Sequence, residues 1–260
     1  MLLIDKLCYY SKLRYINAGE KFLYSIITIA ACIISRSLII ALLVFTVNTV
    51  LTVAIAGISK KRYRNLMLIP VAFLILSTLA VIVNLSRTPM DAFAIPVGNF
   101  YITGSFSSVF FGIQLMATAL AAVSSLYFLS LNTPMPDILM VLSKLHCPAM
   151  ISELMLLIYR FIFVLLEAAV SIMISQKSRL GYKDYKTSLK SFGSMISVLF
   201  IRAMKRSNAL YDAMESRCYD GAIHVLNETS KPNKKEITAI VFFTAVLAVL
   251  TILKKSELIW

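Results

Sequence analysis

The sequence is short of charged residues, and of acidic residues most of all. Only 15% of its 260 residues are charged while 59% are hydrophobic, and its 13 aspartates and glutamates compare with 26 lysines and arginines. A soluble domain is typically about a quarter charged and about half apolar. This composition, with apolar runs long enough to cross a bilayer, excludes an ordinary soluble domain and indicates a polytopic membrane protein.

Residue types that build catalytic and metal sites are also scarce. The four cysteines include no C-x-x-C pair, which argues against a disulfide framework, and there are only two histidines. His146 and Cys147 are adjacent, but no third ligand is near them in the sequence, so they predict no metal site. No Walker sequence G-x-x-x-x-G-K-[ST] occurs, so the chain does not hydrolyse ATP itself. The sequence therefore predicts no catalytic residue, no metal site and no cofactor.

The excess of basic residues has a simple explanation in a membrane protein. Of the 26 lysines and arginines, fourteen lie between Asn132 and Lys235, the least apolar third of the chain. Cytoplasmic loops of membrane proteins carry such an excess, and no nucleic-acid motif with stacking aromatics is present. The first twenty residues lack the apolar core and cleavage site of a signal peptide. The net charge of +13 therefore predicts membrane orientation and no nucleic-acid partner.

Apolar runs predict the membrane crossings. The block Phe22–Ile58 is 37 residues long, too long for one span of a core about 30 Å thick. Two short crossings with a tight turn at Ser35-Arg36-Ser37 fit it better. Pro70 lies near the start of the next apolar run, where proline is least disruptive. Between the third and fourth crossings, 86–103 predicts an external loop with turns. The remaining runs are 66–85, 105–131 and 237–253.

The region from Asn132 to Lys235 has a different pattern. It predicts a short helix over 137–145, a long helix over 151–180, a basic linker over 181–190 and a further helix over 191–217. The stretch 154–174 is apolar enough to span a membrane, but it contains Arg160 and Glu167, which lie seven residues apart on one face and are expected to pair. Hydropathy alone leaves this stretch ambiguous between spanning and lying along the membrane.

Charge parity favours five crossings. Four basic residues in 59–65 form the strongest local signal for a cytoplasmic loop. Two crossings on either side of this loop place both the N-terminus and 132–235 in the cytoplasm, and the last crossing puts the C-terminus outside. The predicted fold is an all-α polytopic membrane protein with about five transmembrane helices plus long cytoplasmic coupling helices. Its regions are 1–131 with four transmembrane helices, 132–235 with the cytoplasmic helices, and 236–260 with the final transmembrane helix and a short tail.

Several spaced motifs, strongest between Asn132 and Gly221, resemble a known family. They are Thr133-Pro134 with Asp137-Ile138-Leu139, Leu145-His146-Cys147-Pro148, Tyr159-Arg160-Phe161, Leu166-Glu167, the stretch 176–182 (QKSRLGY) and the stretch 213–221 (AMESRCYDG). Together they resemble the transmembrane T component of energy-coupling-factor (ECF) transporters, most closely the cobalt-uptake CbiQ branch.

The resemblance implies a role and partners. The T component joins a substrate-capturing integral membrane subunit to two cytoplasmic ATP-binding cassette ATPases, and a small accessory membrane subunit can be present. Two long coupling helices each end in an X-Arg-X motif that docks on an ATPase. Here these motifs would be Ser178-Arg179-Leu180 and Ser216-Arg217-Cys218. Many relatives have Ala-Arg-Gly, so this chain departs at both flanks but keeps Gly181 and Gly221 soon after.

The resemblance also implies location and cargo, and other functions stay open. The expected location is the plasma membrane of a prokaryote, with the N-terminus in the cytoplasm, and the expected cargo is cobalt. Nickel or a vitamin is the alternative cargo. A secondary transporter would need intramembrane ionisable residues or broken helices, ideally in internally repeated halves, and no such repeat is visible. An intramembrane enzyme would need clustered carboxylates or histidines at membrane depth, and the predicted spans contain almost none.

Overall fold

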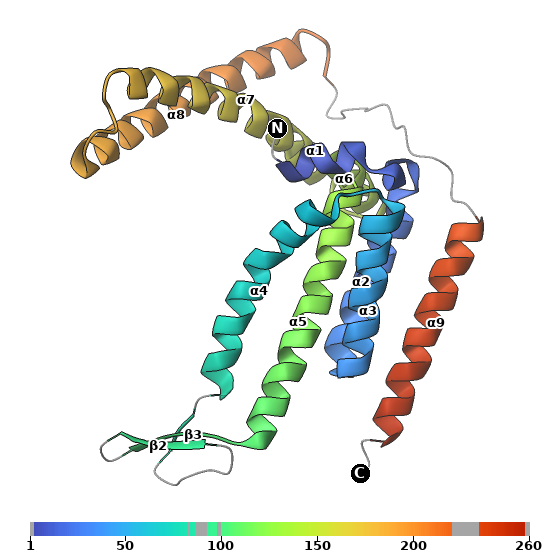
Figure 1. The fold of residues 1–260 in the computed structure, drawn as a ribbon. Helices are drawn as coiled ribbons and strands as arrows, with labels where there is room; N and C mark the ends of the chain where they lie inside the picture. Colours follow the sequence, from blue (N-terminus) through green and yellow to red (C-terminus); the bar gives the residue numbers. More distant parts are fainter. Residues whose placement is uncertain (1–2, 83, 87–92, 98–99, 220–233, 258–260) are drawn as a thin grey trace. The chain divides into compact units, whose positions relative to one another are not determined.

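The computed structural model describes residues 3–82, 84–86, 93–97, 100–219 and 234–257. The chain divides into two compact units, 2–138 with 228–260 and 139–227. The helices of the described residues are α1 (Leu3–Tyr10), η1 (Lys12–Tyr15), α2 (Ala18–Ser35), α3 (Leu38–Val50), η2 (Leu51–Ile55), α4 (Lys60–Ile82), α5 (Phe106–Asn132), α6 (Met135–Lys144), α7 (Ala149–Ser178), α8 (Tyr185–Glu215) and α9 (Lys234–Glu257). Figure 1 labels the helices α1 to α9.

Six helical segments of the described chain are long and apolar enough to cross a membrane: 18–35, 38–55, 60–82, 106–132, 149–178 and 236–254. This confirms the prediction of an all-α polytopic membrane protein. Five of the segments correspond to the five predicted crossings. The sixth is α7, which contains the ambiguous stretch, so length and composition alone again leave its placement open.

The turn between the first two crossings lies where the sequence predicts it. Helix α2 ends at Ser35, Arg36 adopts a left-handed conformation with φ of 42°, and α3 starts at Leu38. The Lys254 ammonium of α9 donates hydrogen bonds to the carbonyl oxygens of Ser35 (3.3 Å) and Arg36 (2.6 Å). A cation on these carbonyls complements the negative end of the helix dipole. The C-terminal end of α9 is therefore fastened to the C-terminal end of α2.

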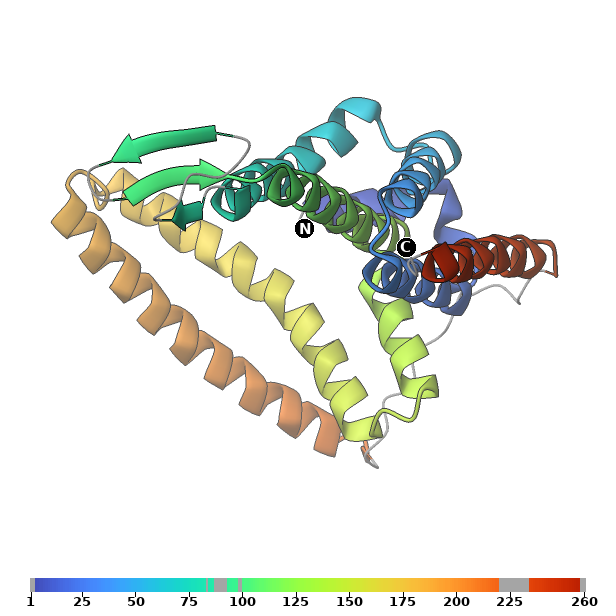
Figure 2. The same ribbon diagram turned by 90° about the horizontal axis from the view of Figure 1, so that it is seen from below.

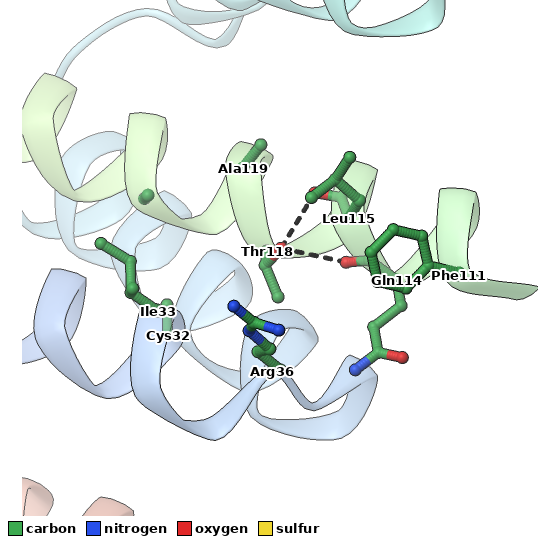
Figure 3. A pocket seen from close by; sticks show the side chains of 9 residues that line it. Cys32, Ile33, Arg36, Phe111, Gln114, Leu115, Thr118 and Ala119 are labelled. Atoms are coloured by element: carbon green, nitrogen blue, oxygen red, sulfur yellow. Dashed lines mark hydrogen bonds between the residues drawn. The ribbon is translucent and has the colours of Figure 1, made fainter. Parts of the chain in front are cut away.

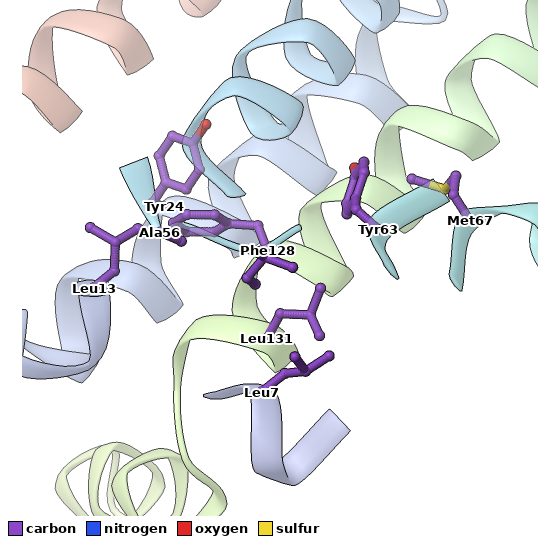
Figure 4. Packing of buried hydrophobic residues seen from close by; sticks show 9 residues of the cluster. Leu7, Leu13, Tyr24, Ala56, Tyr63, Met67, Phe128 and Leu131 are labelled. Carbon is purple, nitrogen blue, oxygen red and sulfur yellow. The ribbon is translucent and has the colours of Figure 1, made fainter. Parts of the chain in front are cut away.

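Helix α5 is the centre of the unit formed by residues 2–138 and 228–260. It packs against α2, α3 and α4, and α9 packs on α2. Figure 4 shows the main apolar cluster, in which the Tyr24 ring meets Phe128 edge-on at 5.2 Å between centroids. Lys21 is 4% exposed and its ammonium donates to the carbonyl oxygens of Leu13 (3.0 Å) and Asn132 (2.8 Å). These bonds tie η1 and the end of α5 to the start of α2.

A buried polar network joins α2, α3 and α5. The Tyr24 hydroxyl donates to Oδ1 of Asn48 (2.8 Å), and Nδ2 of Asn48 donates to the hydroxyls of Ser124 (3.2 Å) and Ser125 (2.8 Å). Thr28 of α2 donates to Ser125 at 3.2 Å. Small and hydroxyl-bearing residues are typical of helix interfaces in membranes, since they let the helix backbones approach closely and their polar groups form hydrogen bonds with one another. The network therefore specifies how these three helices meet.

The prediction for Pro70 is wrong. Helix α4 begins at Lys60, earlier than the apolar run, so Pro70 lies inside the helix. A proline has no backbone N–H, so the carbonyl four residues earlier, that of Leu66, loses its helical donor. The Tyr127 hydroxyl of α5 donates to this oxygen at 3.1 Å. A side chain of a neighbouring helix thus replaces the missing bond, which hydropathy cannot reveal.

The predicted loop 86–103 contains ordered backbone. Three short antiparallel strands, β1 (Asn84–Ser86), β2 (Phe93–Val97) and β3 (Phe100–Gly104), form a sheet in the order β1–β3–β2. In its register Leu85 and Ile95 both lie opposite Ile102. The prediction of turns between α4 and α5 was therefore incomplete, because strands this short leave a weak sequence signal.

Helices α7 and α8 form an antiparallel hairpin, visible side by side in Figure 2. Helix α8 begins at Tyr185, so the predicted linker 181–190 is shorter than expected. The expected pairing of Arg160 with Glu167 is also wrong, because no ion pair joins them in the described chain. Seven residues of α-helix advance by about 10.5 Å, so a shared face does not bring the two charges into contact.

Candidate functional site

The first arginine motif is the end of α7. Arg179 follows the last helical residue, Ser178, and Leu180 adopts the left-handed conformation with φ of 56°. The Gly181 N–H donates to the Gln176 carbonyl at 2.8 Å, and the Leu180 N–H donates to the Lys177 carbonyl at 3.1 Å. These are the two bonds of a Schellman cap, so the helix turns back sharply after Arg179.

The second motif ends α8 in the same way. Cys218 has φ of 56°, equal to that of Leu180. The Tyr219 N–H donates to the Met214 carbonyl at 3.1 Å, and the Cys218 N–H donates to the Glu215 carbonyl at 3.0 Å. Each bond has its counterpart in the first cap. The two arginines therefore occupy the same position in two copies of one backbone motif.

Both motifs are anchored to the opposite helix of the hairpin. At the end of α7, Nε2 of Gln176 donates to the Ser191 carbonyl (2.8 Å), and the Tyr182 hydroxyl donates to Oε1 of Gln176 (2.8 Å). The Ser191 hydroxyl donates to the Gly181 carbonyl at 2.7 Å. At the end of α8, the Tyr219 hydroxyl donates to a carboxylate oxygen of Glu153 on α7. The backbone that carries each arginine is therefore held in place by hydrogen bonds to the other helix of the hairpin.

The two arginines are exposed and far apart. Arg179, Arg217 and their flanking residues are exposed, and Leu180 is 71% exposed. Because α7 and α8 are antiparallel and about 30 residues long, their C-terminal ends are about 45 Å apart. A guanidinium is always charged and presents a planar fork that suits carboxylates. The hairpin can therefore offer one directional cationic contact at each end.

Sequence reasoning located these arginines but missed their backbone setting. It treated the departures from Ala-Arg-Gly as changes at the flanks only. In the structure, Leu180 and Cys218 stand at the left-handed position, where glycine is usual. Gly181 is needed for a different reason, because a Cβ there would lie 2.8 Å from the Gln176 carbonyl oxygen and from the Ser191 hydroxyl. Gly221 lies outside the described residues.

A large part of the hairpin surface is apolar and exposed. No residue of α7 is buried, and Met195 is the one buried residue of α8. One exposed row recurs every four residues along α7, each side chain 39–60% exposed: Leu154, Ile158, Ile162, Leu166, Val170 and Ile174. Contiguous apolar surface of this kind marks a contact with a protein partner or a membrane.

The small residues of α5 divide between two faces. Ala121, Ser124 and Ser125 are fully buried in contacts inside the bundle. Ala119 and Ala122 instead line a groove of about 290 Å³ between α2 and α5. Figure 3 shows Arg36 and Gln114 at this groove. The structure therefore assigns Ala121, Ser124 and Ser125 to packing within the bundle.

Comparisons with known proteins agree with the motif pattern. A family model described as "Cobalt transport protein" (CbiQ) matches residues 10–229. An uncharacterized protein of Methanocaldococcus jannaschii is 34% identical over 98% of this chain and 94% of its own length. A protein of Methanocorpusculum labreanum, whose name describes a fused cobalt transport protein CbiMQ, is 32% identical over 94% of this chain and 41% of its own length. The cobalt transport protein CbiQ of Salmonella typhimurium is 30% identical over 65% of this chain and 75% of its own length.

Proposed function

Because the chain belongs to the CbiQ family of cobalt transport proteins, we propose that it is the transmembrane coupling component of an ECF-type ABC importer. In this role it has no catalytic activity of its own. It transmits ATP-driven motion from two cytoplasmic ATPase subunits to a substrate-capturing membrane subunit. The observation that carries the proposal is the repeated cap, which presents Arg179 and Arg217 from equivalent backbone positions at the two ends of one hairpin.

Two equivalent arginines suit two equivalent partners. Each guanidinium would pair with acidic groups in a groove of one ATPase subunit. The hydrogen bonds from Gln176 and Tyr219 hold each cap against the other helix. Displacing one ATPase would therefore push or pull a whole helix, since the cap does not yield independently. This rigidity is what a coupling element requires.

The pairing of α7 with α8 favours a location outside the hydrocarbon core. The two helices are joined at both ends by hydrogen bonds, so they lie either both inside the hydrocarbon core or both outside it. Helix α8 carries Arg202, Lys205 and Arg206 near its middle, and a basic residue at the centre of a span costs about 2.5–3.5 kcal/mol. If α7 crossed the membrane, α8 would be drawn in with it. We therefore place both along the cytoplasmic face of a prokaryotic plasma membrane, with α2, α3, α4, α5 and α9 as the crossings and the N-terminus inside.

Cobalt ion is the cargo we propose, with nickel or a vitamin as the alternative. The family description and the names of two relatives refer to cobalt transport. The fused relative supports a separate membrane partner, because this chain covers only 41% of it and its name joins an M part to the Q part. The substrate-capturing subunit would correspond to that additional part, and a small accessory membrane subunit is compatible with it.

The proposal is tested by changing the arginines in the complete transporter. Arg179→Ala and Arg217→Ala should each reduce cobalt uptake and ATPase co-purification, because losing one partner of a desolvated charge pair costs about 2–5 kcal/mol. The double variant should lose far more assembly than either single one, because two linked contacts reinforce each other. Lysine at either position should restore activity only in part.

Lys183→Ala is the matched control, since Lys183 is an exposed cation between α7 and α8 that belongs to neither motif. It should leave assembly and uptake unchanged. Membrane content of every variant is measured by quantitative immunoblotting. Normal assembly and uptake in the double variant would mean that the arginines are only helix-end charges, and the coupling role would be wrong.

A further inference from the structure

A groove between α7 and α8 is mainly apolar along α7 and carries most of its cations along α8. Its volume is about 710 Å³, and every residue that lines it belongs to the unit 139–227. The α7 wall contains Leu157, Phe161, Val164 and Leu165. This volume is within the range of about 300–1,000 Å³ typical of pockets for small ligands.

The groove is strongly positive. Five basic side chains line it, and no acidic residue does: Arg160, Arg202, Lys205, Arg206 and Arg217. Four of them come from α8 and its C-terminal cap and one from α7. All five are exposed. Within the described part of the chain none of them lies in an ion pair. Like charges gathered around one cavity repel one another, so an anion that enters would relieve this repulsion.

We propose that this groove binds an anionic membrane phospholipid. The phosphodiester would contact Arg202, Lys205 and Arg206, and a hydrocarbon chain would cover Phe161, Val164 and Leu165. Guanidinium groups bind phosphate oxygens through two parallel hydrogen bonds. Basic pockets between helices at the cytoplasmic side of a membrane are suited to lipid head groups.

The apolar wall decides between a lipid and a smaller anion. Inorganic phosphate would neutralise the cations but leave the α7 side chains in contact with water. An amphiphile contacts both kinds of side chain at once, because its charged group can pair with the cations while its hydrocarbon part covers the apolar side chains. Arg179 does not line the groove, whereas Arg217, the other proposed docking arginine, lies at it, so the lipid site adjoins one of the two docking motifs.

The test measures lipid binding by the purified full-length chain in a neutral detergent. A fluorescent phosphatidylglycerol is titrated into wild type and into Arg202→Gln/Lys205→Gln/Arg206→Gln. The triple variant should bind roughly 100-fold more weakly, since each basic residue near an anionic lipid contributes about 1 kcal/mol, or about fivefold. Phosphatidylcholine should bind weakly to both proteins. Arg217 is left unchanged, so the result does not depend on the proposed coupling role.

The matched control is Lys183→Gln/Lys186→Gln/Lys190→Gln, which removes the same charge from the same hairpin outside the groove. It should bind phosphatidylglycerol like wild type, and Arg202→Lys/Arg206→Lys should keep most of the affinity. Circular dichroism and size-exclusion chromatography confirm that each variant is folded. Equal loss in both triple variants would indicate nonspecific charge attraction and overturn the proposal. Unchanged lipid binding with loss of ATPase co-purification would also overturn it, because the groove would then be a protein-docking surface.

Discussion

At the residue scale, the arginine motifs show how one backbone conformation can be occupied by different side chains. The first motif has leucine and the second has cysteine at the left-handed position, and both caps form the same hydrogen bonds. A residue with a Cβ in this conformation costs roughly 1–2 kcal/mol. The chain bears this cost twice, where glycine would avoid it.

Leu180→Gly and Cys218→Gly should therefore stabilise the protein. We expect a gain of about 0.5–1 kcal/mol each, because glycine removes the strain but adds freedom to the unfolded chain. The measurement is the thermal unfolding midpoint in detergent, combined with hydrogen exchange at the Gly181 and Tyr219 amides. Leu180→Ala is the control, since it removes the side chain but keeps the strained Cβ. A glycine variant no more stable than the alanine variant would contradict this account.

The positions of the arginines could be predicted from the sequence, but their conformation could not. The Ser-Arg pairs and Gly181 are visible in the letters, and they indicate helix ends. A left-handed leucine or cysteine carries no such signal, because most residues of these types adopt other conformations. Only the backbone shows that Leu180 and Cys218 occupy equivalent positions.

At the scale of elements, apolar runs predicted the spans well but not the bonds between them. The turn at Arg36 followed from the length of one run, which was too great for one crossing. The interior position of Pro70 did not follow, because the basic residues before Leu66 continue the helix without being apolar. Its partner Tyr127 lies 61 positions beyond Leu66 in the chain, so no local pattern relates them.

The Tyr127 hydroxyl should matter only while Pro70 is present. Tyr127→Phe leaves the Leu66 carbonyl without its donor, and we expect a loss of about 1–2 kcal/mol. In a Pro70→Ala background the residue-70 N–H can donate to the same carbonyl. The loss should then fall below about 0.5 kcal/mol. Unfolding midpoints of the two single variants and the double variant complete the cycle. Equal losses in both backgrounds would show that the bond does not compensate for the proline.

The polar network at Asn48 should hold α2, α3 and α5 together. Asn48→Ala removes the acceptor of the Tyr24 hydroxyl and the donor to Ser124 and Ser125. Hydrogen bonds between membrane helices contribute about 0.6–2 kcal/mol, so the loss should fall near the upper end because several bonds disappear. Thr46→Ala is the control on α3, since the hydroxyl of Thr46 donates to carbonyls of its own helix. Equal destabilisation by the two changes would argue against a role in helix association.

At the scale of the whole molecule, the two units of the chain differ in how their helices are packed and exposed. The helices with buried polar contacts lie in one unit, where they define a fixed bundle. The hairpin α7–α8 lies in the other unit and leaves its apolar row, its basic groove and both arginines exposed. Composition alone separates these regions, since fourteen of the basic residues fall between Asn132 and Lys235. It does not settle whether α7 crosses the membrane, because α7 meets the length and hydropathy of a span.

The position of the linker between α7 and α8 decides that question. With α2, α3, α4, α5 and α9 as crossings and the N-terminus inside, Lys183 between α7 and α8 lies in the cytoplasm and the C-terminus lies outside. If α7 and α8 crossed together, Lys183 would lie outside and the side of the C-terminus would not change. In a cysteine-free background, a membrane-impermeant maleimide should label Ser256→Cys in intact cells. It should label Lys183→Cys and the control Lys61→Cys only after permeabilisation, because both lie in basic segments assigned to the cytoplasm. Labelling of Lys183→Cys in intact cells, with Lys61→Cys behaving as expected, would make α7 a transmembrane helix. The charged centre of α8 would then need partners within the bilayer, and the hairpin could not be the cytoplasmic lever that the two arginines require.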